Sequence, residues 1–182
     1  KIDGVPVYHS WISFLMSTNT GSNNTWNLSF NYQIRDSVGT IGNKPLYVKA
    51  LSSGLSNLKS FKYNGNTYFL SLVNPNNFVT GVNTIKAYIS KKSSVITTPY
   101  ALASEQFIVA ITPTMPDMGN HTSPNNEALT LNTDNTYTGK INLTMTGVWN
   151  IHLVVKTPDG TVIAGGDNDD SGYSNLYWTV NI

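Results

Sequence analysis

Large apolar and polar residues alternate without exception between Trp26 and Arg35. A period of two is the pattern of a β-strand that buries one side and leaves the other in water. We therefore predict a strand here, preceded by a second strand at Val7–Met16 and a polar loop at Ser17–Thr25. In the strand that begins at Trp26, the residues that face inward would be Trp26, Leu28, Phe30, Tyr32 and Ile34.

Further strands of similar length recur along the chain, with polar turns between them. The pair Asn64-Gly65 is typical of a two-residue hairpin turn because both residues accept a positive φ. Many short strands at this spacing predict an all-β fold, an antiparallel immunoglobulin-like β-sandwich. The strands are expected at Pro45–Leu51, Leu58–Tyr63, Tyr68–Val73, Asn83–Ser90, Phe107–Thr112, Glu127–Asn132, Thr136–Met145, Val148–Lys156 and Asn175–Ile182.

The inward register of these strands supplies the candidate core. His152 falls in register with Asn150 and Lys156 on the polar side, so we predict a solvated surface histidine. His9 precedes an apolar strand, and we assign it a structural role. The predicted core residues are Trp26, Leu28, Phe30, Tyr137, Ile141, Leu143, Met145, Trp149, Ile151 and Leu153.

An internal repeat becomes visible when Trp26 is superposed on Trp149. The chain then divides into two related units near the Ser/Gly-rich stretch at 52–56. Residues 1–54 would form a partial β-sandwich unit with closing strands only, and residues 55–182 a complete one. The matched segments are Ile12–Met16 with Ile141–Met145, Trp26–Phe30 with Trp149–Leu153, and Pro45–Val48 with Leu176–Thr179.

Closing strands alone cannot cover their own apolar row. Each large side chain left in water costs about 1.5 to 3 kcal/mol, and an unpaired strand edge attracts other chains. We therefore expect Trp26, Phe30 and Tyr32 to be buried. The cover would come from strands upstream of Lys1, from the second unit, or from a neighbouring molecule in a dimer.

The composition excludes several classes of partner. Only 12% of the 182 residues are charged, the formal net charge is +1, and no run of Lys or Arg occurs. These values argue against binding to nucleic acid or to anionic membrane surfaces. The absence of cysteine excludes disulfides and thiolate metal sites. No apolar run approaches the roughly 18 residues of a transmembrane segment.

The location that the sequence predicts is extracytoplasmic, in the periplasm or at the cell surface. A low-charge β-protein rich in Asn, Ser and Thr is commonest outside the cytoplasm. The chain begins with Lys1 instead of Met, which suggests a processed or trimmed chain and leaves open a signal peptide or lipid anchor upstream.

Motifs for catalysis are missing from the sequence. There is no Gly-x-Ser-x-Gly elbow, no phosphate-binding loop and no His-Glu-x-x-His. The only glutamates, Glu105 and Glu127, are isolated from each other. We therefore predict a protein that is not an enzyme.

The stretch Met115–His121 holds the chain's only cluster of soft ligand atoms. Met115, Met118 and His121 fall within seven residues, in a loop too rich in Pro, Gly and Asn to be a helix. Thioether and imidazole groups favour Cu(I), so copper is the candidate cofactor. The alternative is structural, because methionine often fills gaps in cores and both thioethers could close one end of the sandwich.

A second candidate metal site lies near the C-terminus. In the loop 167–172, Asp167, Asp169 and Ser171 occupy the first, third and fifth places, and a glycine occupies the sixth, as in a calcium loop. The twelfth place is Trp178, where such loops carry a bidentate glutamate. The alternative is a solvated turn rich in Asx residues.

Four short motifs together resemble the YtkA-like (FixH-like) domain family over residues 68–156. They are Gly81-Val82-Asn83, Met115-Pro116-Asp117-Met118-Gly119, Tyr137-Thr138-Gly139 and Met145-Thr146-Gly147-Val148-Trp149. The resemblance implies an immunoglobulin-like sandwich that is exported or membrane-attached, in a family often suspected of handling copper.

Two classes of function follow from these observations. The first is a structural or interaction module of an exported surface or periplasmic protein, with a protein partner or self-association. The second is a periplasmic copper-binding or copper-delivery domain that uses the Met115, Met118 and His121 loop.

Overall fold

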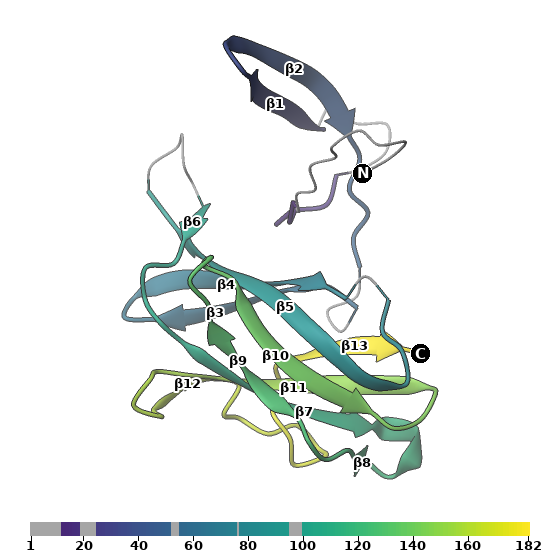
Figure 1. Cartoon of the computed structure of the whole chain (residues 1–182). Coiled ribbons are helices and arrows are strands. Elements are labelled where there is room, and N and C mark those ends of the chain that lie inside the picture. The colour runs from purple at the N-terminus through teal and green to yellow at the C-terminus, as the bar shows by residue number, and fades with distance from the viewer. Residues whose placement is uncertain (1–11, 19–24, 52–54, 76, 95–99) are drawn as a thin grey trace. The chain divides into compact units, whose positions relative to one another are not determined.

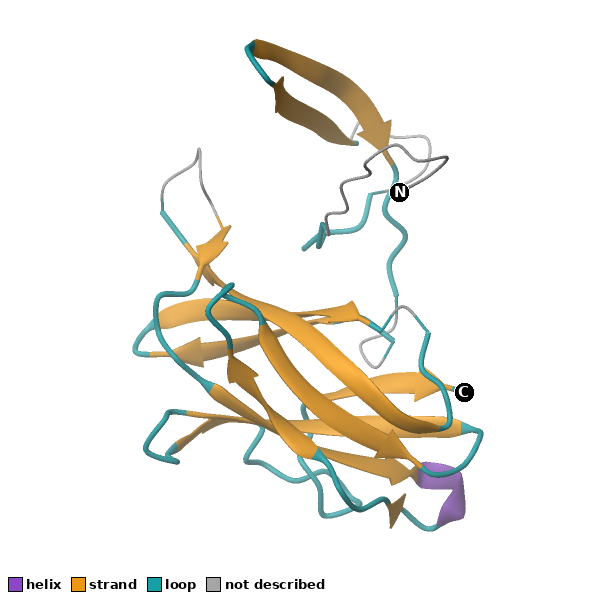
Figure 2. Cartoon of the chain, viewed as in Figure 1, coloured by secondary structure: helices purple, strands orange, loops and turns teal. Residues whose placement is uncertain are grey.

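The computed structural model describes residues 12–18, 25–51, 55–75, 77–94 and 100–182. The chain divides into two compact units, Lys1–Ser52 and Ser53–Ile182, a division two residues from the boundary drawn from the sequence. Strands dominate both units, and the helical turn η1 (Pro116–Met118) interrupts them in the second (Figure 2). Among the described residues, no helix is long and apolar enough to cross a membrane.

The described part of the first unit is built on one antiparallel hairpin. Strand β1 (Trp26–Ile34) pairs with β2 (Ser37–Leu46) around a turn at Arg35, whose φ of +53° is left-handed. β1 lies where the alternating pattern predicted a strand. The strand predicted at Val7–Met16 is wrong over residues 12–16, which form a loop, and its remaining residues, like His9, lie outside the described ranges. The strand predicted at 45–51 is also wrong beyond Leu46.

The apolar row of β1 is not a core. Phe30 and Tyr32 are 45% and 43% exposed. Trp26, which contacts the ring of Phe14 at 5.5 Å, and Leu28 are half-buried. The prediction that these side chains are buried is therefore wrong for the described structure. A two-stranded hairpin has no second layer of its own, so one of its sides stays in water.

The described residues of the second unit form an antiparallel structure of eleven strands. Its strands are β3 (Leu58–Tyr63), β4 (Asn66–Asn74), β5 (Gly81–Lys92), β6 (Tyr100–Leu102), β7 (Ile108–Met115), β8 (His121–Thr122), β9 (Glu127–Leu131), β10 (Tyr137–Leu143), β11 (Val148–Lys156), β12 (Val162–Ala164) and β13 (Tyr177–Asn181). The pairing order is β12-β11-β7-β9-β10-β5-β4-β3, with β13 on β11, β6 on β5 and β8 on β7.

The sheet folds over on itself into a sandwich that is close to a barrel. β12 and β3, at the two ends of the pairing order, contact each other. β10 and β11 follow each other in the chain but do not pair, so the short connection at 144–147 carries the chain from one layer to the other (Figure 1). The predicted all-β antiparallel sandwich is confirmed for this unit.

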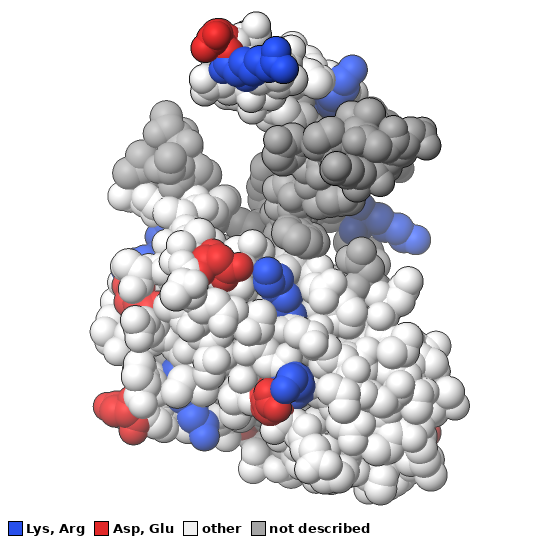
Figure 3. Space-filling model, in the orientation of Figure 1, with Lys and Arg blue, Asp and Glu red and all other residues white. Residues whose placement is uncertain are grey.

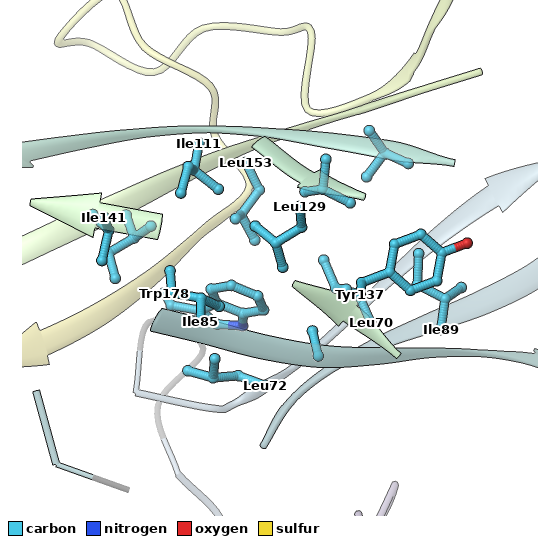
Figure 4. Close-up of a cluster of buried hydrophobic side chains, with 14 of the residues drawn as sticks. Leu70, Leu72, Ile85, Ile89, Ile111, Leu129, Tyr137, Ile141, Leu153 and Trp178 are labelled. Carbon is cyan, nitrogen blue, oxygen red and sulfur yellow. The ribbon is translucent and has the colours of Figure 1, made fainter. Parts of the chain in front are cut away.

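The core lies between the two layers, where side chains of β4 and β5 face those of β7 and β11 (Figure 4). Met145 is half-buried and packs against the edge of this core. Trp178 of β13, which lies in the predicted strand Asn175–Ile182 but was not among the predicted core residues, is also fully buried there. The predicted core residues of β10 and β11 are all buried, at 2% exposure or less, namely Tyr137, Ile141, Leu143, Trp149, Ile151 and Leu153.

Glu105 fastens the segment between β6 and β7 to the sandwich. Its Oε1 accepts hydrogen bonds from Lys91 Nζ at 2.6 Å and from the Tyr68 hydroxyl at 2.8 Å. Its backbone carbonyl accepts a hydrogen bond from the hydroxyl of Tyr137 at 3.4 Å. The hydrogen bond from Lys91 is the main reason that the pKa of Glu105 falls from 4.5 to about 2.

This depressed pKa predicts a specific acid sensitivity. A group whose pKa is lower in the folded state stabilises the fold above its unfolded value, and that contribution disappears as the pH falls from 4.5 towards 2. Between these values, the free energy of unfolding of Glu105→Gln should depend less on pH than that of the wild type. Urea unfolding at a series of pH values measures both slopes.

The control is Glu127→Gln, which removes an exposed carboxylate that pairs with Lys140. Exposed pairs contribute little, so this variant should keep the wild-type slope. Equal slopes in the wild type and Glu105→Gln would contradict the role assigned to Glu105.

Candidate functional site

The methionine loop turns sharply at the end of β7. Pro116 fixes φ at the start of η1, and Gly119 and Asn120 then adopt left-handed φ values of +62° and +59°. The Asn120 N–H donates to the carbonyl of Met115 at 3.0 Å and closes the turn. β8 therefore returns along β7, with His121 directly opposite Met115.

The three soft ligands of this loop differ in environment. Met115 is 4% exposed and belongs to the core, and a Cβ added at Gly147 would lie 2.9 Å from its Cε atom. Met118 is 54% exposed and His121 is also exposed. Met115 thus takes the structural role considered as the alternative for both methionines, whereas Met118 does not. Directly opposed residues of an antiparallel pair share one face, so the side chains of Met115 and His121 are neighbours.

His152 is buried, at 2% exposure, so the prediction of a solvated surface histidine is wrong. Its position in the strand was read correctly, since its neighbours Ile151 and Leu153 face the core and are fully buried. The outer side of β11 is nevertheless covered by the segment between β12 and β13, which pairs with it through Leu176. A period-two pattern shows which residues of a strand share a side, but it does not show that a distant segment covers the outer side.

Both ring nitrogens of His152 are hydrogen-bonded. Nδ1 contacts the carbonyl oxygen of Ser174, which can only accept, so this nitrogen carries a hydrogen. In the neutral ring Nε2 then accepts from the Thr114 hydroxyl at 2.9 Å. The rings of Tyr173 and Tyr177 lie 5.2 and 5.5 Å away. The imidazole thus connects β7, β11 and the covering segment.

The acidic loop has the geometry of an Asx turn. Asp169 Oδ1 accepts hydrogen bonds from the Ser171 N–H at 2.9 Å and from the Ser171 hydroxyl. The bond from this hydroxyl is the largest of the effects that lower the pKa of Asp169, and the nearby His152 acts in the same direction. Asp169 Oδ2 lies 3.9 Å from His152 Nδ1. The Asp167 carbonyl accepts from the N–H of Asn175 at 2.9 Å.

Asp169 and Ser171 therefore already bond to each other within the fold, and the backbone carbonyl of Asp167 bonds to Asn175. Within the described ranges, no group of three or more His, Cys, Asp or Glu side chains is placed to hold a metal ion. The proposed calcium set of Asp167, Asp169 and Ser171 contains only two carboxylates, and it stays a prediction. The hydrogen bonds from Ser171 to Asp169 match the alternative, a turn rich in Asx residues.

The cluster around His152 is the site that sequence reasoning missed. Gly165 could have indicated it, because a glycine allows two backbones to approach closely. A Cβ at Gly165 would lie 2.0 Å from the Leu153 carbonyl oxygen, and the Ser174 hydroxyl donates to that same oxygen at 2.6 Å. Gly165 is thus the position that lets the covering segment lie against β11.

Alanine substitutions test this role. Gly165 and Gly172 both have positive φ, +73° and +83°, but a side chain at Gly172 would meet nothing within 4 Å. Gly172→Ala should cost only the left-handed backbone strain, about 1 kcal/mol. Gly165→Ala should cost more than about 3 kcal/mol because of its backbone clash. Urea unfolding measures both variants, and equal losses would show that the close approach is unimportant.

A sequence model of the YtkA-like family matches residues 63–154, just over half of the chain. The matched range runs from the end of β3 into β11 and includes the methionine loop and His152. It confirms the resemblance drawn from the sequence over residues 68–156. No curated protein and no solved structure matches the chain.

Proposed function

The chain belongs to the YtkA-like family, and on this basis we propose that it is a non-enzymatic structural and interaction module of an exported protein. The module acts in the periplasm or at the cell surface. Its role is to supply a rigid sandwich whose loops contact other proteins or other parts of the same protein.

The observation that carries this proposal is the use of the polar groups inside the second unit. Glu105 fastens the segment before β7, His152 fastens the segment before β13, and Asp169 shapes the turn within that segment. Catalysis requires a titratable group that can reach a substrate proton or a reacting atom. These three side chains instead fix loops to the sandwich, which supports a structural role.

The surface chemistry supports the same role. Charged residues make up 12% of the chain, and on the face in Figure 3 positive and negative side chains are sparse and scattered. Steering of nucleic acid requires a basic patch or stripe, which that face does not carry. Weakly charged surfaces of this kind suit contacts with other proteins.

Export can be tested with a single introduced thiol, because the chain contains no cysteine. Thr133 is exposed in the turn between β9 and β10. In cells that make the protein from its own gene, Thr133→Cys should react with a maleimide that cannot cross the cytoplasmic membrane. The same variant made without any leader should react only after lysis. Labelling that needs lysis in both cases would contradict export.

Copper binding is the second candidate function, supported by the pairing of β7 with β8. That pairing places Met115 and His121 opposite each other, with Met118 in the turn between them. The donor set suits Cu(I) by its softness. Met118 and His121 are accessible, whereas the thioether of Met115 would have to bind from the edge of the core.

Titration of the purified protein with Cu(I) tests this candidate. If the site exists, the wild type should show one saturable binding event. Met118→Leu, nearly equal in volume, should lose the event while remaining folded. The matched control is Met16→Leu, which alters an exposed methionine in the first unit and should bind like the wild type. Equal binding by all three proteins would rule out the methionine loop as the ligand.

A further inference from the structure

One hydrogen bond of the second unit recurs in the first. The indole N–H of Trp149 donates to the carbonyl oxygen of Met145 at 2.9 Å, and the indole N–H of Trp26 donates to that of Met16 at 3.0 Å. Each tryptophan lies at the start of a strand, β11 or β1, and each methionine lies just before it in the chain. The loops between them differ in length, since the two pairs are four and ten residues apart.

A second contact recurs two residues after each methionine. Gly147 N–H donates to the Ile182 carbonyl at 2.8 Å, and Ile182 N–H returns a bond at 3.1 Å. In the first unit, Thr18 N–H donates to the Val48 carbonyl at 2.8 Å. Val48 N–H returns a bond to the Thr18 hydroxyl, also at 2.8 Å. The same crossing between strand and loop thus occurs in both units.

The strand register agrees with both contacts. Trp26 pairs with Leu46 as Trp149 pairs with Val180, so Val48 and Ile182 both lie two residues beyond the tryptophan's partner. Residues 45–48 therefore correspond to 179–182. The sequence-based match of 45–48 with 176–179 was wrong by three residues. Because β-register depends on contacts made across the sheet, a short sequence match does not fix it.

The corresponding positions differ sharply in burial. Leu153 and Val155 of β11 are fully buried, because side chains of β4 and β5 cover them in the core. Counted from the tryptophans, the equivalent residues of β1 are Phe30 and Tyr32, which are 45% and 43% exposed. On the other strand of the hairpin, Ile41 pairs with Phe30 and is 51% exposed. The first unit repeats the closing strands but lacks their cover among the described residues.

Resting on the proposed structural role, we propose that residues 12–18 and 25–48 belong to the closing strands of another YtkA-like sandwich. The apolar face around Phe30, Tyr32 and Ile41 binds the opening strands of that sandwich, supplied ahead of residue 12 in the same polypeptide. These strands carry apolar side chains at every second position of their inner side, as β5 does at Ile85, Ala87 and Ile89. The protein is then a tandem array of YtkA-like sandwiches.

The repeat also assigns a partner to the backbone of β1. In the second unit, β11 pairs with β7 on the edge opposite β13, from Asn150 to Lys156. The corresponding edge of β1 runs from Asn27 to Gln33. A strand equivalent to β7 pairs there in antiparallel orientation and removes an edge that would otherwise attract other chains.

Hydrogen exchange tests the proposal on two proteins. One is the 182-residue chain, and the other is the same chain extended by the roughly 100 residues that its gene encodes directly before Lys1, enough for one sandwich. In the short chain, amides of β1 should exchange rapidly. In the extended chain they should slow by about 100-fold or more, because exchange then requires opening of a packed sandwich.

Two substitutions in the extended chain separate the apolar face from the opposite face. Tyr32→Asp should remove the protection of β1. Gln33→Asp, at the next residue on the polar side, should retain it. Rapid exchange of β1 in both lengths of chain would overturn the proposal, as would the absence of a β-rich segment ahead of Lys1 in the gene. Protection in the short chain that rises with concentration would overturn it in favour of a second copy.

The outcome is independent of the export test. Protection of β1 without maleimide labelling of Thr133→Cys would leave the tandem array standing and contradict the exported role. Labelling of Thr133→Cys without protection of β1 would support the exported role and contradict the tandem array.

Discussion

The fold of the second unit depends on the burial of Trp149 at the point where the chain crosses between layers. The indole is fully buried, so its N–H needs a partner, and the Met145 carbonyl in the crossing connection provides it. This hydrogen bond joins the connection that leaves β10 in one layer to the start of β11 in the other. With the crossing fixed, β11 runs through the centre of its layer between β7 and the pair β12 and β13. The same bond recurs in the first unit, where the Trp26 indole N–H donates to the Met16 carbonyl.

Around this frame, the polar side chains fix connections in place. His152 lies on the outer side of β11 and is bonded from two directions, by Thr114 of β7 and by the carbonyl of Ser174. Gly165 allows the segment that carries Ser174 to lie directly against the Leu153 backbone. Glu105 holds the segment before β7 in a similar way, because its carboxylate accepts hydrogen bonds from Lys91 and Tyr68. Each of these connections is thereby held against the sandwich by side-chain hydrogen bonds.

The two units illustrate the difference between forming a strand and burying it. β1 and β11 begin with the same tryptophan contact, and the register of β1 with β2 matches that of β11 with β13, yet only β11 lies under a second layer. An apolar strand face is stable in water only at a cost that a second sheet removes. Among the described residues, the apolar side of the hairpin has no such sheet, and Phe30, Tyr32 and Ile41 stay exposed.

The sequence by itself determined the features that depend on neighbours along the chain. Period-two alternation identified β1, β10 and β11 and the inward residues of the last two, because successive side chains of a strand point to opposite sides whatever surrounds them. The tryptophan match revealed the two units. Burial was decided by tertiary structure, because it depends on which distant segment covers each side of a strand. For that reason His152 is buried under the segment before β13, Phe30 remains exposed, and Met115 enters the core while Met118, three residues later, does not.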